Sequence, residues 1–140
     1  MQKEKCMENE NKKTEHVSYD KFKKMDIRIG TIREVEPVEG ADKLLRCQID
    51  FGMKMPDGGT MEPERDIRQI VSGIREYYPD FAGLVGKQVL YIVNLEPRTI
   101  RGAESHGMLM AVDGVEDAEG KRRPVFLVPE DPVDAGARVR

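Results

Sequence analysis

Apolar and polar residues alternate along much of this chain, and a period of two is the pattern of a β-strand with one buried face. A similar alternation begins at Met25 and changes phase at Gly30, which predicts a first strand with a bulge or sharp bend at that glycine. The clearest run covers residues 45–51, where we expect the apolar positions to face a core and the polar ones to face solvent; the apolar set is Leu45, Cys47, Ile49 and Phe51, and the polar set is Arg46, Gln48 and Asp50.

Four further strands are predicted, over residues 67–74, 88–93, 108–112 and 125–128, and the continuous apolar run of the second predicts a strand covered on both faces. Ser18 is placed to cap a short helix over residues 19–24, with Phe22 as its contact to the core. A helical turn is expected over residues 80–86. The predicted connections are a turn over residues 37–42, a long exposed link over Met53–Asp66 and a turn at 121–124.

These five to six short strands, with one helical turn between the third and the fourth, predict an all-β domain. Among common types the five-stranded OB-fold barrel with a short helical turn fits best, although an SH3-like barrel or a small sandwich has the same periodicity. The length of 140 residues suits one domain. Residues 1–18 hold four Lys, four Glu and no aromatic residue, so we expect a disordered polar tail there and place the domain at residues 19–140.

Charge and cysteine content narrow the function. The net charge of −3 and the pI near 5.5 weigh against a protein that coats nucleic acid through overall positive charge, so an RNA site must be a local basic patch. The two cysteines, Cys6 and Cys47, predict neither a disulfide framework nor a zinc site. No signal-peptide pattern is present, and no stretch reaches the roughly 18 apolar residues of a membrane span. We therefore expect a cytoplasmic protein with no membrane partner.

Residues 94–108 are the strongest candidate for a binding site. They follow the most apolar strand, yet they are polar and include two forked donors suited to phosphate, Arg98 and Arg101, and two groups that hydrogen-bond to bases or riboses, Asn94 and Ser105. On an OB barrel this segment is the loop between the last two strands, which flanks nucleic-acid sites. A solvated charged connection is the competing interpretation.

Three neighbouring features belong to the same hypothesis. Lys43 lies in the turn that would form the second flank of an OB-fold site. Met108 is a base-stacking residue if it is exposed and a core residue if it is buried. The basic cluster Lys121–Arg123 widens a phosphate-binding surface if it lies on the same edge as Arg98, and is otherwise the charged tip of a hairpin.

An enzyme is not expected. Ser105 and His106 are adjacent, but a nucleophile elbow needs glycine where Ala103 stands, and neighbouring residues rarely point at each other. His16 lies in the tail, so no histidine-based metal or acid–base cluster can be assembled. The sequence contains no P-loop or dinucleotide fingerprint. We predict no catalytic residue, metal or cofactor.

Taken in order, the motifs resemble those of the tRNA-binding domain family, which occurs as stand-alone tRNA-binding proteins and as a part of methionyl-tRNA synthetases. The resemblance covers about residues 19–140. Its motifs are MDIRIGTI at 25–32, GADKL at 40–44, RQIVSGI at 68–74 and VNLEPRTIRGAESHGMLMA at 93–111. It implies an OB-fold with a C-terminal extension, recognition of the folded shape of tRNA, frequent homodimers and assistance to methionyl-tRNA synthetase.

Carried over residue by residue, the resemblance implies a tRNA-binding set of Lys43, Asn94, Arg98, Arg101, Ser105, Gly107 and Met108. The sequence departs from the family at His106, where glutamine is usual and where pH sensitivity is added, and in the long Met53–Asp66 connection. The alternative is a protein-export chaperone of CsaA type, which shares the barrel and binds polypeptides but generally lacks the S-x-G-M element found here at 105–108.

Overall fold

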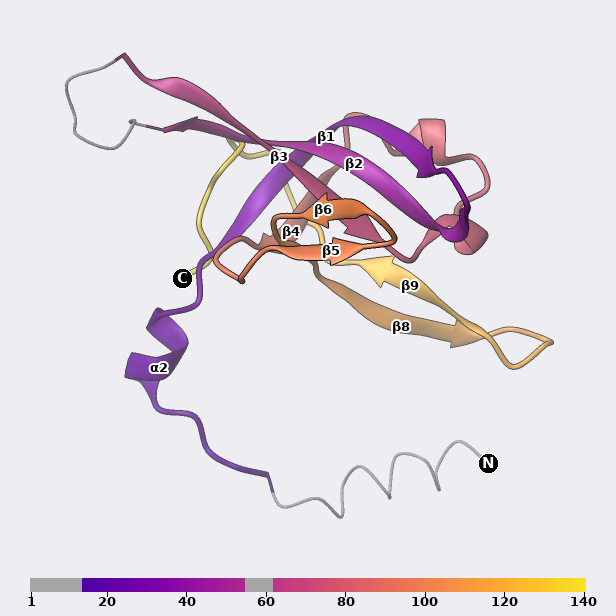
Figure 1. Cartoon of the computed structure of the whole chain (residues 1–140). Coiled ribbons are helices and arrows are strands. Elements are labelled where there is room, and N and C mark those ends of the chain that lie inside the picture. Colours follow the sequence, from indigo (N-terminus) through magenta and orange to yellow (C-terminus); the bar gives the residue numbers. More distant parts are fainter. Residues whose placement is uncertain (1–13, 55–61) are drawn as a thin grey trace.

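A computed structural model describes residues 14–54 and 62–140, and its main body is one five-stranded antiparallel sheet (Figure 1). The strands lie in the order β3-β2-β1-β4-β7. Their bounds are Ile27–Val38 for β1, Ala41–Lys54 for β2, Glu64–Ser72 for β3, Gln88–Ile92 for β4 and Met108–Leu109 for β7. Two separate hairpins complete the fold, formed by β5 (Arg98–Ile100) with β6 (Ala103–Ser105) and by β8 (Ala111–Glu116) with β9 (Arg122–Phe126).

The sheet curls until its two edges meet, at the residues just before β7. The His106 N–H donates to the Gln69 carbonyl oxygen at 2.8 Å, and the Val71 N–H donates to Ser105 Oγ at 3.0 Å. Gln69 and Val71 belong to β3, the opposite edge of the sheet. The five-stranded all-β barrel of the OB type predicted from the sequence is therefore confirmed.

Within the described ranges, three short helical segments accompany the barrel. Helix α2 (Tyr19–Lys23) begins at Ser18, whose hydroxyl accepts from the Lys21 N–H at 3.2 Å, as predicted. The prediction that Phe22 reaches the core is wrong: the helix stands away from the barrel (Figure 1), and the Phe22 side chain is 44% exposed. The predicted helical turn at 80–86 is confirmed as the 3-10 helix η2 (Phe81–Leu84), and a second turn, η1 (Arg75–Tyr77), precedes it.

The barrel interior is built from the predicted apolar faces. The four apolar residues predicted to face the core in the run 45–51 are all buried. Leu45 and Ile49 are fully covered, and burial of each side chain contributes about 1.5–3 kcal/mol to folding. The β1 bulge lies at Arg33, between the Ile32–Ile49 and Glu34–Gln48 pairs, rather than at Gly30. Gly30 instead allows a close approach, because a Cβ there would lie 2.7 Å from the Phe51 ring.

Asp50 departs from the predicted alternation, because it is fully buried instead of facing solvent. Gly52, with φ of 82°, interrupts the pairing of β2 with β3, and the chain there buries successive residues. The Asp50 carboxylate accepts from the Gly52 N–H at 2.8 Å, from Arg33 Nη2 at 2.7 Å and from Arg65 Nη1 at 2.7 Å. Burial alone would raise the pKa of Asp50, but these donors outweigh it and the pKa is lowered.

The C-terminal segment lies beside the first residues of β1, which β2 leaves unpaired. The Ile29 N–H donates to the Ala137 carbonyl at 2.9 Å, and the Gly136 N–H donates to the Ile29 carbonyl at 2.7 Å. Gly136 has φ of 87°, and a Cβ there would collide with the Phe51 carbonyl. The predicted C-terminal extension is confirmed as an added strand-like edge.

Three other predictions meet a different outcome. The turn predicted at residues 121–124 lies instead at Asp117–Gly120, and β9 begins at Arg122. The reason is that the Asp117 carboxylate and carbonyl oxygens accept from the N–H groups of the residues that follow. Strands β2 and β3 extend into the expected 53–66 connection, as far as Lys54 and from Glu64. Residues 1–13 of the predicted tail, and 55–61 of the long link, lie outside the described residues.

Substitution of Asp50 by Asn tests the buried carboxylate. Asp50→Asn retains an acceptor for the Gly52 N–H but removes the charge shared by two half-exposed arginines, so we expect a loss of about 1–2 kcal/mol in unfolding free energy at pH 7. Because the folded-state pKa is lowered, this contribution is complete above the ordinary carboxyl pKa of about 3.9 and disappears as pH falls through the folded value. Urea unfolding of both proteins between pH 7 and pH 3 measures it, and a difference that does not change with pH would contradict the assignment.

Candidate nucleic-acid interface

The segment predicted as a polar connection contains the β5–β6 hairpin. Ile100 pairs with Ala103, so Arg101 and Gly102 form a two-residue turn with φ of 51° and 81°. Positive φ at both positions is the requirement of a type I′ turn, which matches the twist of a hairpin. Arg101 is therefore held at the exposed apex of the hairpin. Strands β5 and β6 are too short for the period-two pattern to predict them.

A small apolar cluster fastens this hairpin to the barrel. Ile100 and Ala103 pack with Val71 of β3 and with residues around the β1–β2 turn, which are Val38, Ala41 and Leu44. Lys43 is exposed in the same stretch of β2. The cluster therefore brings together the two flanks that the sequence analysis assigned to one site, with Arg101 on one and Lys43 on the other.

Ser105 and Gly107 hold the segment in place. Ser105 is only 4% exposed, and its hydroxyl accepts from the Val71 N–H and donates to the Gly107 carbonyl at 3.2 Å. A Cβ at Gly107 would lie 3.0 Å from the Ile70 side chain and from the Ile92 carbonyl. Both residues therefore act on the position of their neighbours.

Met108 and Arg98 are the exposed members of the segment. Met108 pairs with Ile92 across β4 and β7, and its side chain is 46% exposed, which disfavours the core interpretation. Arg98 is exposed on β5. Both line one hollow of about 70 Å³, together with Val71, Leu95, Glu96, Ile100, Ser105 and Gly107. The β5–β6 hairpin and β7 thus present a guanidinium and a flexible thioether beside one hollow.

Asn94 has a different environment from the one expected for a base contact. Its Oδ1 accepts from the Asp26 N–H at 2.9 Å, and its Nδ2 donates to the Lys24 carbonyl at 2.6 Å. The carboxamide therefore ties the link between α2 and β1 to the end of β4. These partners are 68 and 70 residues away in sequence, so no local pattern could identify them.

Two glutamines on the outer face of β2 and β3 were not identified from the sequence. Gln48 Nε2 donates to Gln69 Oε1 at 3.1 Å, and Gln69 Nε2 donates to the Glu104 carbonyl at 2.8 Å. They join the outer face of the barrel to the hairpin beside His106, whose Nε2 lies 3.3 Å from Glu104 Oε1. Both occupy outward positions of alternating strands, and that period-two pattern is the signal that could have found them.

The basic cluster Lys121–Arg123 lies near η1. Lys121 Nζ is 4.0 Å from Glu76 Oε2, and the Arg123 guanidinium lies 5.5 Å from the centre of the Tyr78 ring. Arg122 donates to the Gly114 carbonyl at 2.8 Å and so braces its own hairpin.

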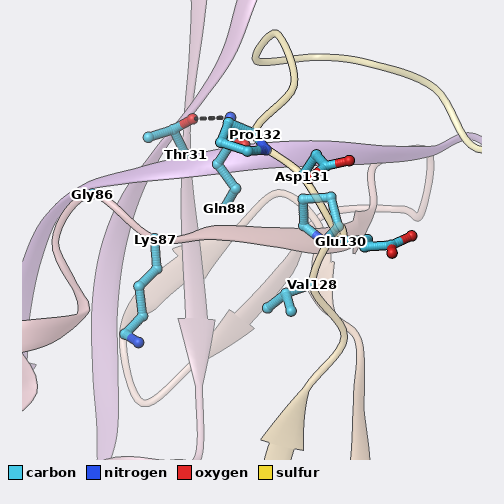
Figure 2. Close-up of a pocket in the computed structure, with 9 residues that line it drawn as sticks. Thr31, Gly86, Lys87, Gln88, Val128, Glu130, Asp131 and Pro132 are labelled. Atoms are coloured by element: carbon cyan, nitrogen blue, oxygen red, sulfur yellow. Dashed lines mark hydrogen bonds between the residues drawn. The ribbon is translucent and has the colours of Figure 1, made fainter.

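An open hollow of about 420 Å³ lies between the start of β4 and the C-terminal segment (Figure 2). The Gln88 side chain spans it: Nε2 donates to the Val133 carbonyl at 2.6 Å and to Thr31 Oγ1 at 3.3 Å, and Oε1 accepts from the Val133 N–H at 3.0 Å. Lys87, Glu130 and Asp131 supply its charged groups, and no aromatic side chain lines it. The Gln88 side chain thus anchors the C-terminal segment to β4.

Residues 14–54 and 62–140 contain no group of three or more acidic, histidine or cysteine side chains arranged to hold a metal ion. In the same ranges no helix is long and apolar enough to cross a membrane. Cys47 lies in the barrel core, where burial raises the pKa of its thiol to about 11.

Substitution of Ser105 by Ala separates positioning from contact. Ser105→Ala leaves the buried Val71 N–H without its acceptor, and we expect a loss of about 1–3 kcal/mol in unfolding free energy. Met108→Ala, at a half-exposed position, is expected to lose less than the roughly 2–5 kcal/mol of a buried methionine. Urea unfolding at pH 7 measures both, and a larger loss for Met108→Ala than for Ser105→Ala would reverse the two roles.

The chain is similar to a known protein family. A family model described as "Putative tRNA binding domain" matches residues 27–138. The methionine–tRNA ligase of Thermococcus kodakarensis is 40% identical over 131 residues, which are 94% of this chain and 15% of that ligase. The ligase of Methanothrix thermoacetophila is 42% identical over 124 residues, 89% of this chain and 16% of the ligase. The chain thus spans about one sixth of the length of these relatives.

Solved structures agree in fold. A protein related to methionyl-tRNA synthetase from Pyrococcus horikoshii superposes with a TM-score of 0.67 at 32% identity, covering 91% of this chain and all of its own. The chaperone CsaA from Bacillus anthracis superposes with a TM-score of 0.65, covering 90% of this chain and all of its own, but at 24% identity it shows the fold alone.

Proposed function

The chain belongs to the tRNA-binding domain family, and from this premise we propose that it binds tRNA as a non-catalytic module that assists methionyl-tRNA synthetase. The observation that carries the proposal is the family match over residues 27–138, which includes the complete segment 94–108. The fold supports it, because the two flanks of an OB-fold nucleic-acid site are fastened together by one apolar cluster.

The chemistry divides between contact and positioning. Arg98, Arg101 and Lys43 are exposed, and none of the ion pairs formed among the described residues involves them, so their charges are available to phosphate oxygens. Met108 supplies an apolar surface for an unstacked base. Ser105, Gly107 and Asn94 keep this surface in place.

Recognition of folded shape is consistent with the form of this surface. The hollow beside Met108, at about 70 Å³, is far smaller than the roughly 300–1,000 Å³ of sites that enclose a small molecule. A surface of this kind reads the spacing of phosphates and an exposed base rather than a sequence.

A homodimer in the cytoplasm is part of the proposal. The β8–β9 hairpin carries exposed valines on a two-stranded sheet: Val112 pairs with Val125, Val115 is also exposed, and Val128 is exposed just after β9. A patch of this kind on a small domain marks an interaction site, and a self-complementary patch produces a twofold dimer.

The alternative is a protein-export chaperone of CsaA type that binds polypeptides, which shares the fold at 24% identity. The unpaired cations beside the S-x-G-M segment favour RNA. A competition experiment distinguishes the two alternatives. An unfolded polypeptide is expected to displace tRNA from a chaperone but not from an RNA-binding module.

Binding of tRNA is the first test. In a gel-shift titration we expect total tRNA to bind more tightly than a single-stranded oligonucleotide of equal length. Two to four phosphate contacts predict a log–log salt slope of roughly −2 to −4, and a slope steeper than about −7 would contradict a small patch. Arg98→Ala is expected to cost about 1.5–3 kcal/mol of affinity, and Met108→Ala about 1–3 kcal/mol. Unchanged affinity in both variants would eliminate this site even if the wild type binds tRNA.

Sedimentation equilibrium at micromolar concentration tests the dimer. We expect the mass of two chains, and we expect Val112→Lys with Val125→Lys to give a monomer, because each copy of this cross-strand pair then carries two positive charges and the two copies repel each other. Arg138→Gln, a change in the C-terminal segment, is the control. A monomeric wild type would contradict the proposal.

A further inference from the structure

A third hollow, of about 370 Å³, lies at the end of the barrel that carries the β1–β2 turn. We call it the η1–η2 hollow, and the residues that line it are Asp42, Arg75, Glu76, Pro79 and Phe81. It therefore combines the start of β2 with both 3-10 helices. Asp42 is the immediate neighbour of Lys43, so the hollow adjoins the surface assigned above.

The lining supplies three kinds of contact. Arg75 forms none of the ion pairs made among the described residues, and its guanidinium is available to an anion. Asp42 and Glu76 are exposed carboxylates, which accept hydrogen bonds only. Phe81 is partly buried and packs against the barrel core, so it offers a ring held in position.

Cations from other elements lie close to residues that line the hollow or adjoin its lining. Lys121 of the β8–β9 turn reaches to 4.0 Å from Glu76 Oε2, and Arg123 lies over the ring of Tyr78, between the two 3-10 helices. Lys43 follows Asp42 on β2. In a chain of net charge −3, this is a second local concentration of basic side chains.

Size and chemistry together indicate the ligand. The volume of about 370 Å³ falls within the roughly 300–1,000 Å³ of small-molecule sites, as does that of the 420 Å³ hollow beside β4, but of these two only the η1–η2 hollow is lined by an arginine and an aromatic ring. A guanidinium next to an aromatic ring suits a phosphate attached to a base. Two acceptor-only carboxylates would repel a free phosphate, but they suit a base edge that carries N–H donors.

We propose that the η1–η2 hollow holds one unpaired nucleotide of the bound tRNA, with guanosine preferred. Arg75 and Lys121 bind its phosphate, Phe81 and Pro79 pack against the base, and Asp42 and Glu76 accept from its donor edge. Guanine presents adjacent N1–H and N2–H groups there, whereas uracil presents a single N–H. The proposal rests on the proposed function and adds a nucleotide subsite to it.

A nucleotide titration tests the hollow without tRNA. In ¹⁵N-labelled wild-type protein, guanosine 5′-monophosphate is expected to shift the amide signals of Asp42, Arg75, Glu76 and Phe81 to saturation at millimolar concentration, and uridine 5′-monophosphate to require more. Arg75→Gln should remove the saturation. No saturable shift up to about 10 mM, the range of very weak sites, or an unchanged titration in Arg75→Gln, would overturn the proposal.

The tRNA titration gives the second readout. Arg75→Gln and Lys121→Gln are each expected to weaken tRNA binding about three- to tenfold and to reduce the salt slope by about 1. Phe81→Leu should weaken binding at unchanged slope, because it removes a ring and no charge. Urea midpoints equal to wild type establish that the variants are folded, and Arg75→Gln alone carries the test if Phe81→Leu is destabilised.

Arg138→Gln is the matched control, because it removes a cation at the opposite end of β1 from the hollow. Arg138 forms a backbone β-bridge with Arg28 at the start of that 12-residue strand, and the β1–β2 turn follows its other end. Its affinity should equal that of the wild type. If all hollow variants bind tRNA as the wild type does, the subsite is excluded and the proposed function stands. If the wild type binds no tRNA, the proposed function fails, and the nucleotide titration still decides the hollow.

Discussion

Closure of the barrel between β3 and the residues before β7 is the constraint on which the rest of this structure depends. The Ser105 hydroxyl and the His106 N–H supply the acceptor and the donor that two backbone groups of β3 need. A buried N–H without an acceptor costs about 1–3 kcal/mol, so this edge cannot open cheaply. The closure orients the residues that precede and follow it in the sequence, which are the β5–β6 hairpin and Met108. The surface with exposed cations is therefore a consequence of how the barrel closes.

The distribution of ion pairs explains how an acidic chain carries a basic surface. Elsewhere in the barrel, two buried carboxylates hold three of the arginines: Asp50 holds Arg33 and Arg65, and Asp66 holds Arg68. Asp26 is paired with Arg28, whose hydrogen bond lowers the pKa of that carboxyl. Among the described residues, the ion pairs leave out the arginines of the hairpin and of η1. Net charge is thus a poor guide to the local field, which the pairing determines.

The long motif at 93–111 serves two purposes that its sequence does not separate. Asn94, Ser105 and Gly107 satisfy backbone groups or allow close approach, whereas Arg98, Arg101 and Met108 face solvent. A substitution in the first group acts on binding through the fold, and one in the second acts on it directly. Affinity and stability must therefore be measured together for any variant of this segment.

Much of this protein was determined by local sequence. Period-two alternation located the core faces of the strands, Ser18 located the start of α2, and the forked donors of Arg98 and Arg101 located the candidate surface, because each depends on neighbours a few residues away. The tertiary structure decided what depends on distant partners. Asp50 is buried because arginines from β1 and β3 converge on it, and Phe22 is exposed because helix α2 stands away from the barrel and buries none of its residues. Asn94 and Ser105, predicted as contacts, are bound to backbone groups 34 to 70 residues away, and the η1–η2 hollow joins segments more than 30 residues apart. Such pairings follow from chain topology, which no periodicity encodes.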